Sequence, residues 1–108
     1  MKFLYSVKDS KAGCFVSFVV GDSDSVIQRG FISSMLGDSD LSNFPQDFDL
    51  YCLGSVNPIT GFLEPLITPR LICSGFDAKS LALNLVSSAA ASGLHQAGGV
   101  SSTPEEGV

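Results

Sequence analysis

The sequence predicts an α+β fold, with a four-stranded antiparallel sheet made of two hairpins and helix packed on one face of it. Two pairs of short aromatic and β-branched runs, each separated by turn-forming residues, predict the hairpins. Apolar residues spaced every three to four positions follow each pair and predict one helix after each hairpin. The expected order is therefore β-β-α-β-β-α, and the pattern leaves the pairing order of the hairpins open.

The first hairpin is predicted from residues 3–7 and 14–20, which form strands around a turn at residues 8–13. Gly13 suits this turn because glycine accepts positive φ angles. Alternation in the second strand assigns one side of it to the core. The residues on that side are Cys14, Val16, Phe18 and Val20.

The first helix is predicted over residues 23–36. Asp22 or Ser23 is a suitable N-cap, and Gly37 is a suitable residue to end the helix. The apolar stripe consists of Ile27, Phe31 and Met35, widened by Val26, Ile32 and Leu36.

The second hairpin is predicted from strands at residues 48–54 and 62–67, after a loop at residues 41–47. Pro65 and Pro69 place the fourth strand at a sheet edge or end it early, because proline cannot donate to a strand ladder.

The second helix is predicted to start with Asp77 as its cap and to stop at Gly93. Its stripe consists of Leu81, Leu85, Val86 and Ala89. We therefore expect one α+β domain over residues 1–93. Residues 94–108 are rich in Gly and Ser with an acidic end, and we expect this tail to be disordered.

The composition indicates one small domain with more apolar surface than its core can bury. The chain has 108 residues and is 44% hydrophobic, with a mean hydropathy of +0.32. A core this small cannot absorb all of that apolar area, so we expect a homo-oligomer. The net charge of −5 means that any nucleic-acid surface must be a local patch, because the molecule as a whole repels phosphate.

Cysteine count and hydropathy indicate the compartment. Cys14, Cys52 and Cys73 form no CxxC pair, which favours small buried side chains in a reducing environment over disulfides or zinc. The N-terminus has no signal-peptide pattern, and the apolar stretch from Leu81 to Ala91 is too short for a membrane span. We expect a cytoplasmic protein.

No enzyme site, cofactor site or metal site is expected. The single histidine, His95, lies in the predicted tail, where nothing would hold a catalytic arrangement in place. The repeated GDSD sequence at residues 21–24 and 37–40 resembles calcium-loop spacing only in part. Solvated cap and loop carboxylates explain these residues better.

Features suited to single-stranded nucleic acid are few. Lys8 and Lys11 share the first hairpin turn, where a solvated turn and a phosphate contact are both possible interpretations. Sheet aromatics are usually core residues, but Tyr5 and Tyr51 are candidates for base stacking because their hydroxyls favour a wet edge.

Three segments of the chain form a recognisable combination. They are Lys2, Tyr5-Ser6-Val7 and Asp9-Ser10-Lys11-Ala12-Gly13, then Asn43-Phe44-Pro45-Gln46-Asp47-Phe48-Asp49-Leu50-Tyr51 with Leu53-Gly54, and Thr60-Gly61. Together they resemble the small nonstructural protein of gokushovirus-type microviruses, the Chlamydia-phage lineage of single-stranded DNA phages. The resemblance covers about residues 2–75, and the segment from Asp77 onwards has no counterpart.

This resemblance implies a nonstructural DNA-binding protein, made in the cytoplasm of the infected bacterium and concerned with synthesis or packaging of the genome. The matching basic and aromatic positions are Lys2, Tyr5, Lys11 and Tyr51, and charge alone adds Lys8, Arg29 and Arg70. The alternative is a protein–protein interaction module that acts on phage or host replication or capsid-assembly proteins without contacting DNA.

Overall fold

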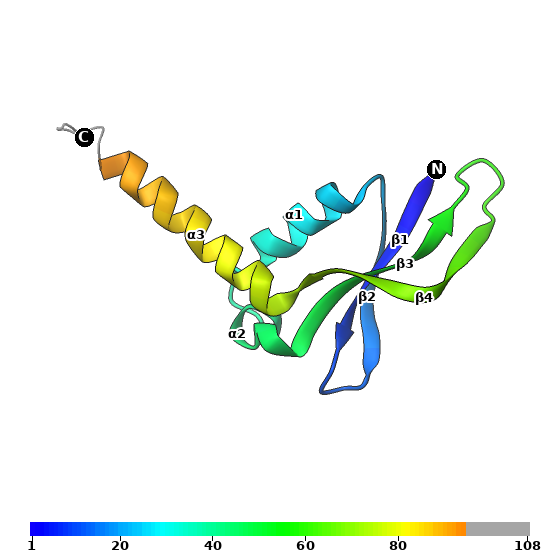
Figure 1. Cartoon of the computed structure of the whole chain (residues 1–108), viewed down its shortest axis with the longest axis horizontal. Coiled ribbons are helices and arrows are strands. Elements are labelled where there is room, and N and C mark those ends of the chain that lie inside the picture. The colour runs from blue at the N-terminus through cyan, green and yellow to red at the C-terminus, as the bar shows by residue number, and fades with distance from the viewer. Residues whose placement is uncertain (95–108) are drawn as a thin grey trace.

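The computed structural model describes residues 1–94, with side chains described to residue 87. His95 and the predicted tail from residue 95 onwards lie outside these residues. The fold class is confirmed, since a four-stranded antiparallel sheet alternates with helices in the order β-β-α-β-β-α (Figure 1). The strands are β1 (Lys2–Asp9), β2 (Cys14–Gly21), β3 (Phe48–Val56) and β4 (Leu63–Ser74). The helices are α1 (Asp24–Ser34), α2 (Asp40–Asn43), the 3-10 helix η1 (Pro45–Asp47) and α3 (Gly75–Leu94).

The two hairpins join through their first strands. The spatial order is β2-β1-β3-β4, so β1 and β3 are central and the second strand of each hairpin is an edge. Pairing of β1 with β3 runs from Lys2 opposite Val56 to Asp9 opposite Phe48. The edge position predicted for the proline-containing fourth strand is confirmed.

Of the two alternatives that the prolines left open, β4 takes the edge position and does not end early. It continues through both prolines to Ser74 because an edge strand has one side on which a missing N–H breaks no ladder bond. The prolines instead coincide with an irregularity in the pairing of β4 with β3. Arg70 lies opposite Cys52 and Pro65 opposite Gly54, which leaves residues 66–69 facing Leu53 alone.

The core face predicted for β2 is wrong. Ser17 has a positive φ of 55°, and the register shifts between Tyr5 and Val7 on the neighbouring strand. This bulge breaks the two-residue alternation, so Val16 and Val19, rather than every second residue, share the helix side of the sheet. Phe18 and Val20, which follow the bulge, are consequently exposed. Cys14 is also exposed, because it is the first residue of β2 and lies beside the turn.

Helix α1 starts as predicted, with the Ser23 side chain accepting from the Val26 amide. It ends slightly earlier, with Met35 as its C-cap. Phe31 and Met35 from the predicted stripe are buried, whereas Val26 and Leu36 are exposed.

The loop predicted at residues 41–47 is wrong, because short helical turns α2 and η1 occupy it. Ser39 caps α2 through a hydrogen bond from the Ser42 amide. The hydroxyl of Ser42 in turn donates to the Met35 carbonyl at 2.7 Å, and Lys79 Nζ donates to that carbonyl at 2.8 Å and to Ser42 Oγ at 3.0 Å. These bonds tie α2 to the end of α1 and to α3.

Helix α3 begins two residues before the predicted cap. The Ser74 hydroxyl accepts from the Asp77 amide at 3.1 Å, so Ser74 performs the capping assigned to Asp77. A side chain at Gly75 would collide with the carbonyl oxygens of Pro45 and Phe48. Glycine is therefore required where α3 starts against η1 and β3.

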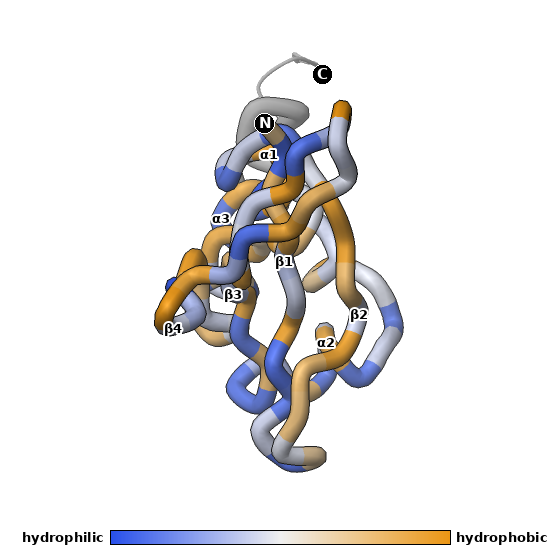
Figure 2. Tube along the Cα trace, turned by 90° about the vertical axis from the view of Figure 1, so that its right-hand side faces the viewer, coloured by the Kyte–Doolittle hydropathy of each residue, from blue (hydrophilic) through white to orange (hydrophobic). Residues whose placement is uncertain are grey.

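The core is small and the molecule is elongated. Its principal extents are 56 × 34 × 18 Å, because α3 and the β3–β4 hairpin project at opposite ends (Figure 1). The buried apolar residues are Tyr5, Phe31, Met35, Leu50, Cys52, Cys73, Ala78 and Ala82. Many larger apolar side chains remain exposed on both edge strands and on α3. Figure 2 shows by colour how apolar residues recur along β2 and β4. Burial is confirmed for Cys52 and Cys73 but is wrong for Cys14.

Candidate nucleic-acid interface

Within residues 1–94, the sheet has one face packed against helices and one face without them. Tyr5, Leu50 and Cys52 belong to the core with residues of α1 and α3, so they mark the helix side. The alternate residues Lys8, Phe15 and Tyr51 lie on the opposite side, which we call the open face.

Three side chains from three adjacent strands meet on the open face. Lys8 lies opposite Phe15 in the β1–β2 pairing, and its Nζ is 5.8 Å from the centre of the Phe15 ring. The Phe15 and Tyr51 rings meet edge to face, with centroids 5.6 Å apart and planes at 81°. We call Lys8, Phe15 and Tyr51 the platform.

The β1–β2 turn, which links the strands of Lys8 and Phe15, holds a second lysine. The Asp9 carboxylate accepts from the amides of Lys11 and Ala12 at 3.0 and 3.2 Å. Gly13 closes the turn with a φ of 72° and donates to the Asp9 carbonyl at 2.8 Å. Lys11 is exposed on this fixed turn, two residues beyond the end of β1. The platform and Lys11 thus combine aromatic rings with positive charge.

Tyr5, the other predicted stacking residue, is in the wrong place for that role. Its side chain is fully buried on the helix side, and its hydroxyl donates to Asp24 Oδ1 at 2.8 Å. Burial and this hydrogen bond raise the pKa of the Tyr5 hydroxyl above its ordinary value. Tyr5 therefore fixes α1 to the sheet and has no ring face free for a base.

Two of the predicted basic residues are neutralised by nearby carboxylates. Lys2 forms an ion pair with Asp22, and Arg70 contacts Asp24 through bonds of 2.8 and 3.4 Å. Hydrogen bonds from Arg70 and then Tyr5 hold the pKa of Asp24 below its ordinary value. These ion pairs make Lys2 and Arg70 less available to bind phosphate.

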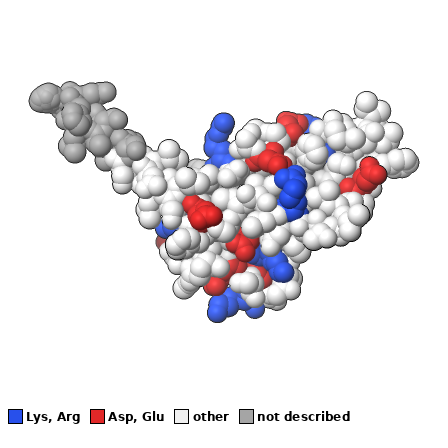
Figure 3. Space-filling view, in the orientation of Figure 1, with Lys and Arg blue, Asp and Glu red and all other residues white. Residues whose placement is uncertain are grey.

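Arg29 does not join the platform either. It is exposed on α1, which packs on the helix side of the sheet. Acidic and basic side chains are intermingled on the face drawn in Figure 3. Of the seven predicted residues, the structure therefore places Lys8 and Tyr51 in the platform and Lys11 on the turn that follows β1.

Phe15 is the residue that the predicted site lacked. Its position follows from the turn, since pairing of Asp9 with Cys14 places Lys8 opposite Phe15. The length of the turn was visible in the sequence, but the pairing of β1 with β3 that brings in Tyr51 was not.

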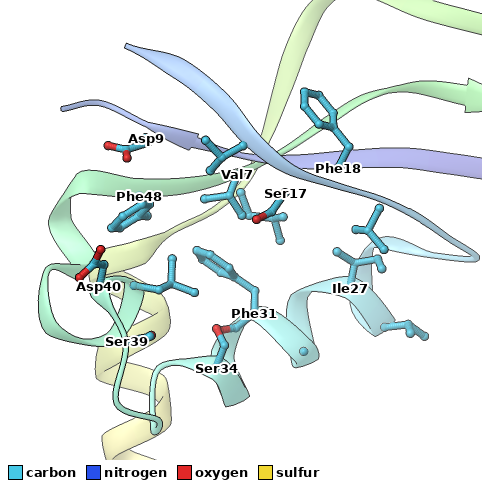
Figure 4. Close-up of a pocket in the computed structure, with 16 residues that line it drawn as sticks. Val7, Asp9, Ser17, Phe18, Ile27, Phe31, Ser34, Ser39, Asp40 and Phe48 are labelled. Atoms are coloured by element: carbon cyan, nitrogen blue, oxygen red, sulfur yellow. The ribbon is translucent and has the colours of Figure 1, made fainter. Parts of the chain in front are cut away.

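A separate apolar cleft lies on the helix side, between the first hairpin and α1. It has a volume of about 610 Å³ and is open to solvent (Figure 4). Val7, Phe31 and Phe48 form part of its lining, and the exposed Val19 contributes to it from β2. The Phe18 ring points away from the cleft, on the other side of β2 (Figure 4). Such a cleft is suited to an apolar side chain rather than to phosphate.

Within residues 1–94, no helix is long and apolar enough to cross a membrane. The same residues contain no group of three or more His, Cys, Asp or Glu side chains placed to hold one metal ion.

The fold and the platform define a small α+β protein with an open, aromatic sheet face. The chain belongs to the Phage ORF5 protein family, whose model matches residues 2–78, and it is therefore a bacteriophage protein. The matched segment contains the whole sheet, the platform and the first residues of α3. Comparison with curated proteins gives no match, and neither does comparison with solved structures.

Proposed function

We propose that this phage protein is a non-enzymatic accessory factor that binds single-stranded DNA during synthesis or packaging of the genome. The proposal places it in the cytoplasm of the infected bacterium and in the gokushovirus-type lineage, which its sequence resembles. The observation that carries the proposal is the platform, in which Lys8 lies over Phe15 beside Tyr51 on a face without helices.

The platform suits unpaired bases. Both rings are half-buried, so each keeps part of its surface available while the sheet holds it in place. Stacking of a base on such a ring contributes about 1–3 kcal/mol and tolerates any base. A duplex offers no unstacked base to this surface, so the proposal is specific for single strands.

Charge makes this binding weak. Lys8 is the basic residue of the platform and Lys11 lies on the turn after it, while Lys2 and Arg70 are paired with acids. The net charge of −5 opposes the approach of DNA over longer distances. We therefore expect binding at low salt that declines as salt is added.

Fluorescence anisotropy with labelled oligonucleotides tests this function. At low salt the protein should bind a mixed-sequence single strand and bind the matching duplex less tightly. Equal affinity for both forms would contradict stacking on the platform. No binding to either form would remove the DNA function.

The apolar cleft favours a second candidate, an interaction module for phage or host replication or capsid-assembly proteins. In that role an apolar side chain of the partner would enter the cleft beside Val19. Purified phage replication and capsid proteins should then bind the parent chain and lose affinity for Val19→Ser, which changes an exposed residue of the cleft lining. Lys8→Glu/Lys11→Glu should bind them normally, because those lysines lie outside the cleft lining.

A further inference from the structure

We propose that two copies of this chain pair through α3, with the helix of each copy lying in the groove between α1 and α3 of the other. This inference does not depend on DNA binding. It follows from an apolar stripe on α3, of which only the first part packs against the rest of the same chain.

The stripe begins as core and ends in solvent. Ala78 and Ala82 are fully buried, whereas Leu81, Leu85 and Val86 on the same side of the helix are exposed. A 20-residue helix is about 30 Å long, and most helices of this size need tertiary packing to be stable. The far part of α3 lacks that packing within the described chain (Figure 1).

A groove of matching character lies alongside the stripe. It has a volume of about 490 Å³ between α1 and α3. Its apolar lining consists of Ile32, Leu36, Ala82 and Leu85, and its polar lining of Ser25, Gln28, Arg29 and Ser33. An apolar helix would cover the exposed Leu36 and Leu85 there.

Charge identifies a second copy as the occupant. Two molecules of net charge −5 repel each other, so they approach most easily on surfaces without acidic groups, and the groove lining contains none. Residues 80–94 of α3 contain no Asp, Glu, Lys or Arg. A two-fold axis would place each helix in the groove of the other copy, so that one pair of chains covers both exposed stripes.

Light scattering coupled to size-exclusion chromatography tests the pairing, with two matched leucine variants. The parent chain should run as a dimer at high micromolar concentration. Leu85→Ser should raise the dimer dissociation constant roughly tenfold or more, because each copy loses a leucine from the contact. Leu83→Ser is the control, because Leu83 is similarly exposed but lies on the opposite side of α3.

A monomeric parent, or a dimer that both variants weaken equally, would overturn the pairing.

Hydrogen exchange on the parent chain gives a readout without substitutions. Amides of residues 81–87 should exchange faster on dilution, while those of β1 and β3 should not change. If dilution changes exchange only on the sheet, the contact lies elsewhere. Because neither measurement involves DNA, a result against the pairing would leave the DNA proposal intact. Absence of DNA binding would likewise leave the pairing proposal intact.

Discussion

The Nζ atom of Lys8 lies 5.8 Å from the centre of the Phe15 ring, directly across the β1–β2 hairpin. The ammonium group thus lies over the Phe15 ring, and the Phe15 and Tyr51 rings meet edge to face. Attraction between a cation and a ring contributes about 0.5–1 kcal/mol at an exposed site, which is enough to bias where the ammonium group rests. The platform is therefore partly organised before any ligand arrives.

Charge reversal at the first turn should abolish DNA binding. In Lys8→Glu/Lys11→Glu, carboxylates replace the two cations beside the platform and repel phosphate. The circular dichroism spectrum should stay unchanged, since both lysines are exposed. Anisotropy with a labelled single strand provides the measurement.

Arg29→Glu is the control for that experiment. It reverses one exposed charge on α1, on the other side of the sheet, and should retain most of the affinity. If Arg29→Glu weakens binding as much as Lys8→Glu alone, only net charge matters and the platform is not the site.

Removal of the Tyr51 ring should weaken binding by about 1–3 kcal/mol, the contribution of one stacked base. Tyr51→Leu is the test variant, and Tyr51→Phe should bind normally because it keeps the ring. The chain has two tyrosines and no tryptophan, and the other tyrosine, Tyr5, is buried. Quenching of tyrosine fluorescence by DNA should therefore disappear in Tyr51→Phe even though affinity remains. Persistent quenching would mean that bases stack elsewhere.

The strands were predictable because aromatic and β-branched residues fill both hairpins. What the sequence did not disclose was the bulge at Ser17, since a serine with positive φ has no distinctive pattern. That bulge moved Phe18 and Val20 out of the predicted core. The length of β4 was also missed, because proline stops a strand only where its missing N–H would break a ladder.

Part of the candidate site could not be predicted, because it depends on which strands pair in the folded sheet. Lys8 and Lys11 were predictable from the turn alone. Tyr5 and Tyr51 look alike in the sequence, and only the sheet determines that Tyr5 faces the helices while Tyr51 faces away from them. Pairing of Lys2 and Arg70 with acids also depends on residues distant in the chain.

Asp24 should make stability fall in acid. Its pKa is lowered in the folded state from the ordinary value of 3.8, so its stabilising effect is complete above that pH and is lost as the pH falls below it. At neutral pH, Asp24→Ala should lower the free energy of unfolding by about 1–2 kcal/mol, a modest amount because the Arg70 pair is partly exposed. Urea unfolding at several pH values should show the variant and the parent converging in acid. A constant difference across that range would contradict this role.

Lys79 should contribute to stability and not to DNA binding. Its ammonium donates to the Met35 carbonyl and the Ser42 hydroxyl, which joins α3 to α1 and α2. Lys79→Ala should lower the free energy of unfolding by about 1–3 kcal/mol, because buried acceptors lose a charged donor. DNA affinity should be retained under conditions where the variant is folded. Loss of affinity in a folded Lys79→Ala protein would extend the interface beyond the platform.

The salt dependence of single-stranded DNA binding tests the central claim most directly. Each lysine that contacts a phosphate adds about 0.7 to the magnitude of the slope of log affinity against log salt concentration. Contacts from Lys8 and Lys11 alone predict a slope of magnitude about 1.4. Lys8→Glu/Lys11→Glu should show no measurable binding at any salt concentration. A parent slope of about 3 or more would require phosphate contacts from residues such as Lys2 and Arg70, which the structure pairs with acids, and would contradict the proposed site. Absence of binding by the parent chain at the lowest salt concentration would contradict the DNA function itself.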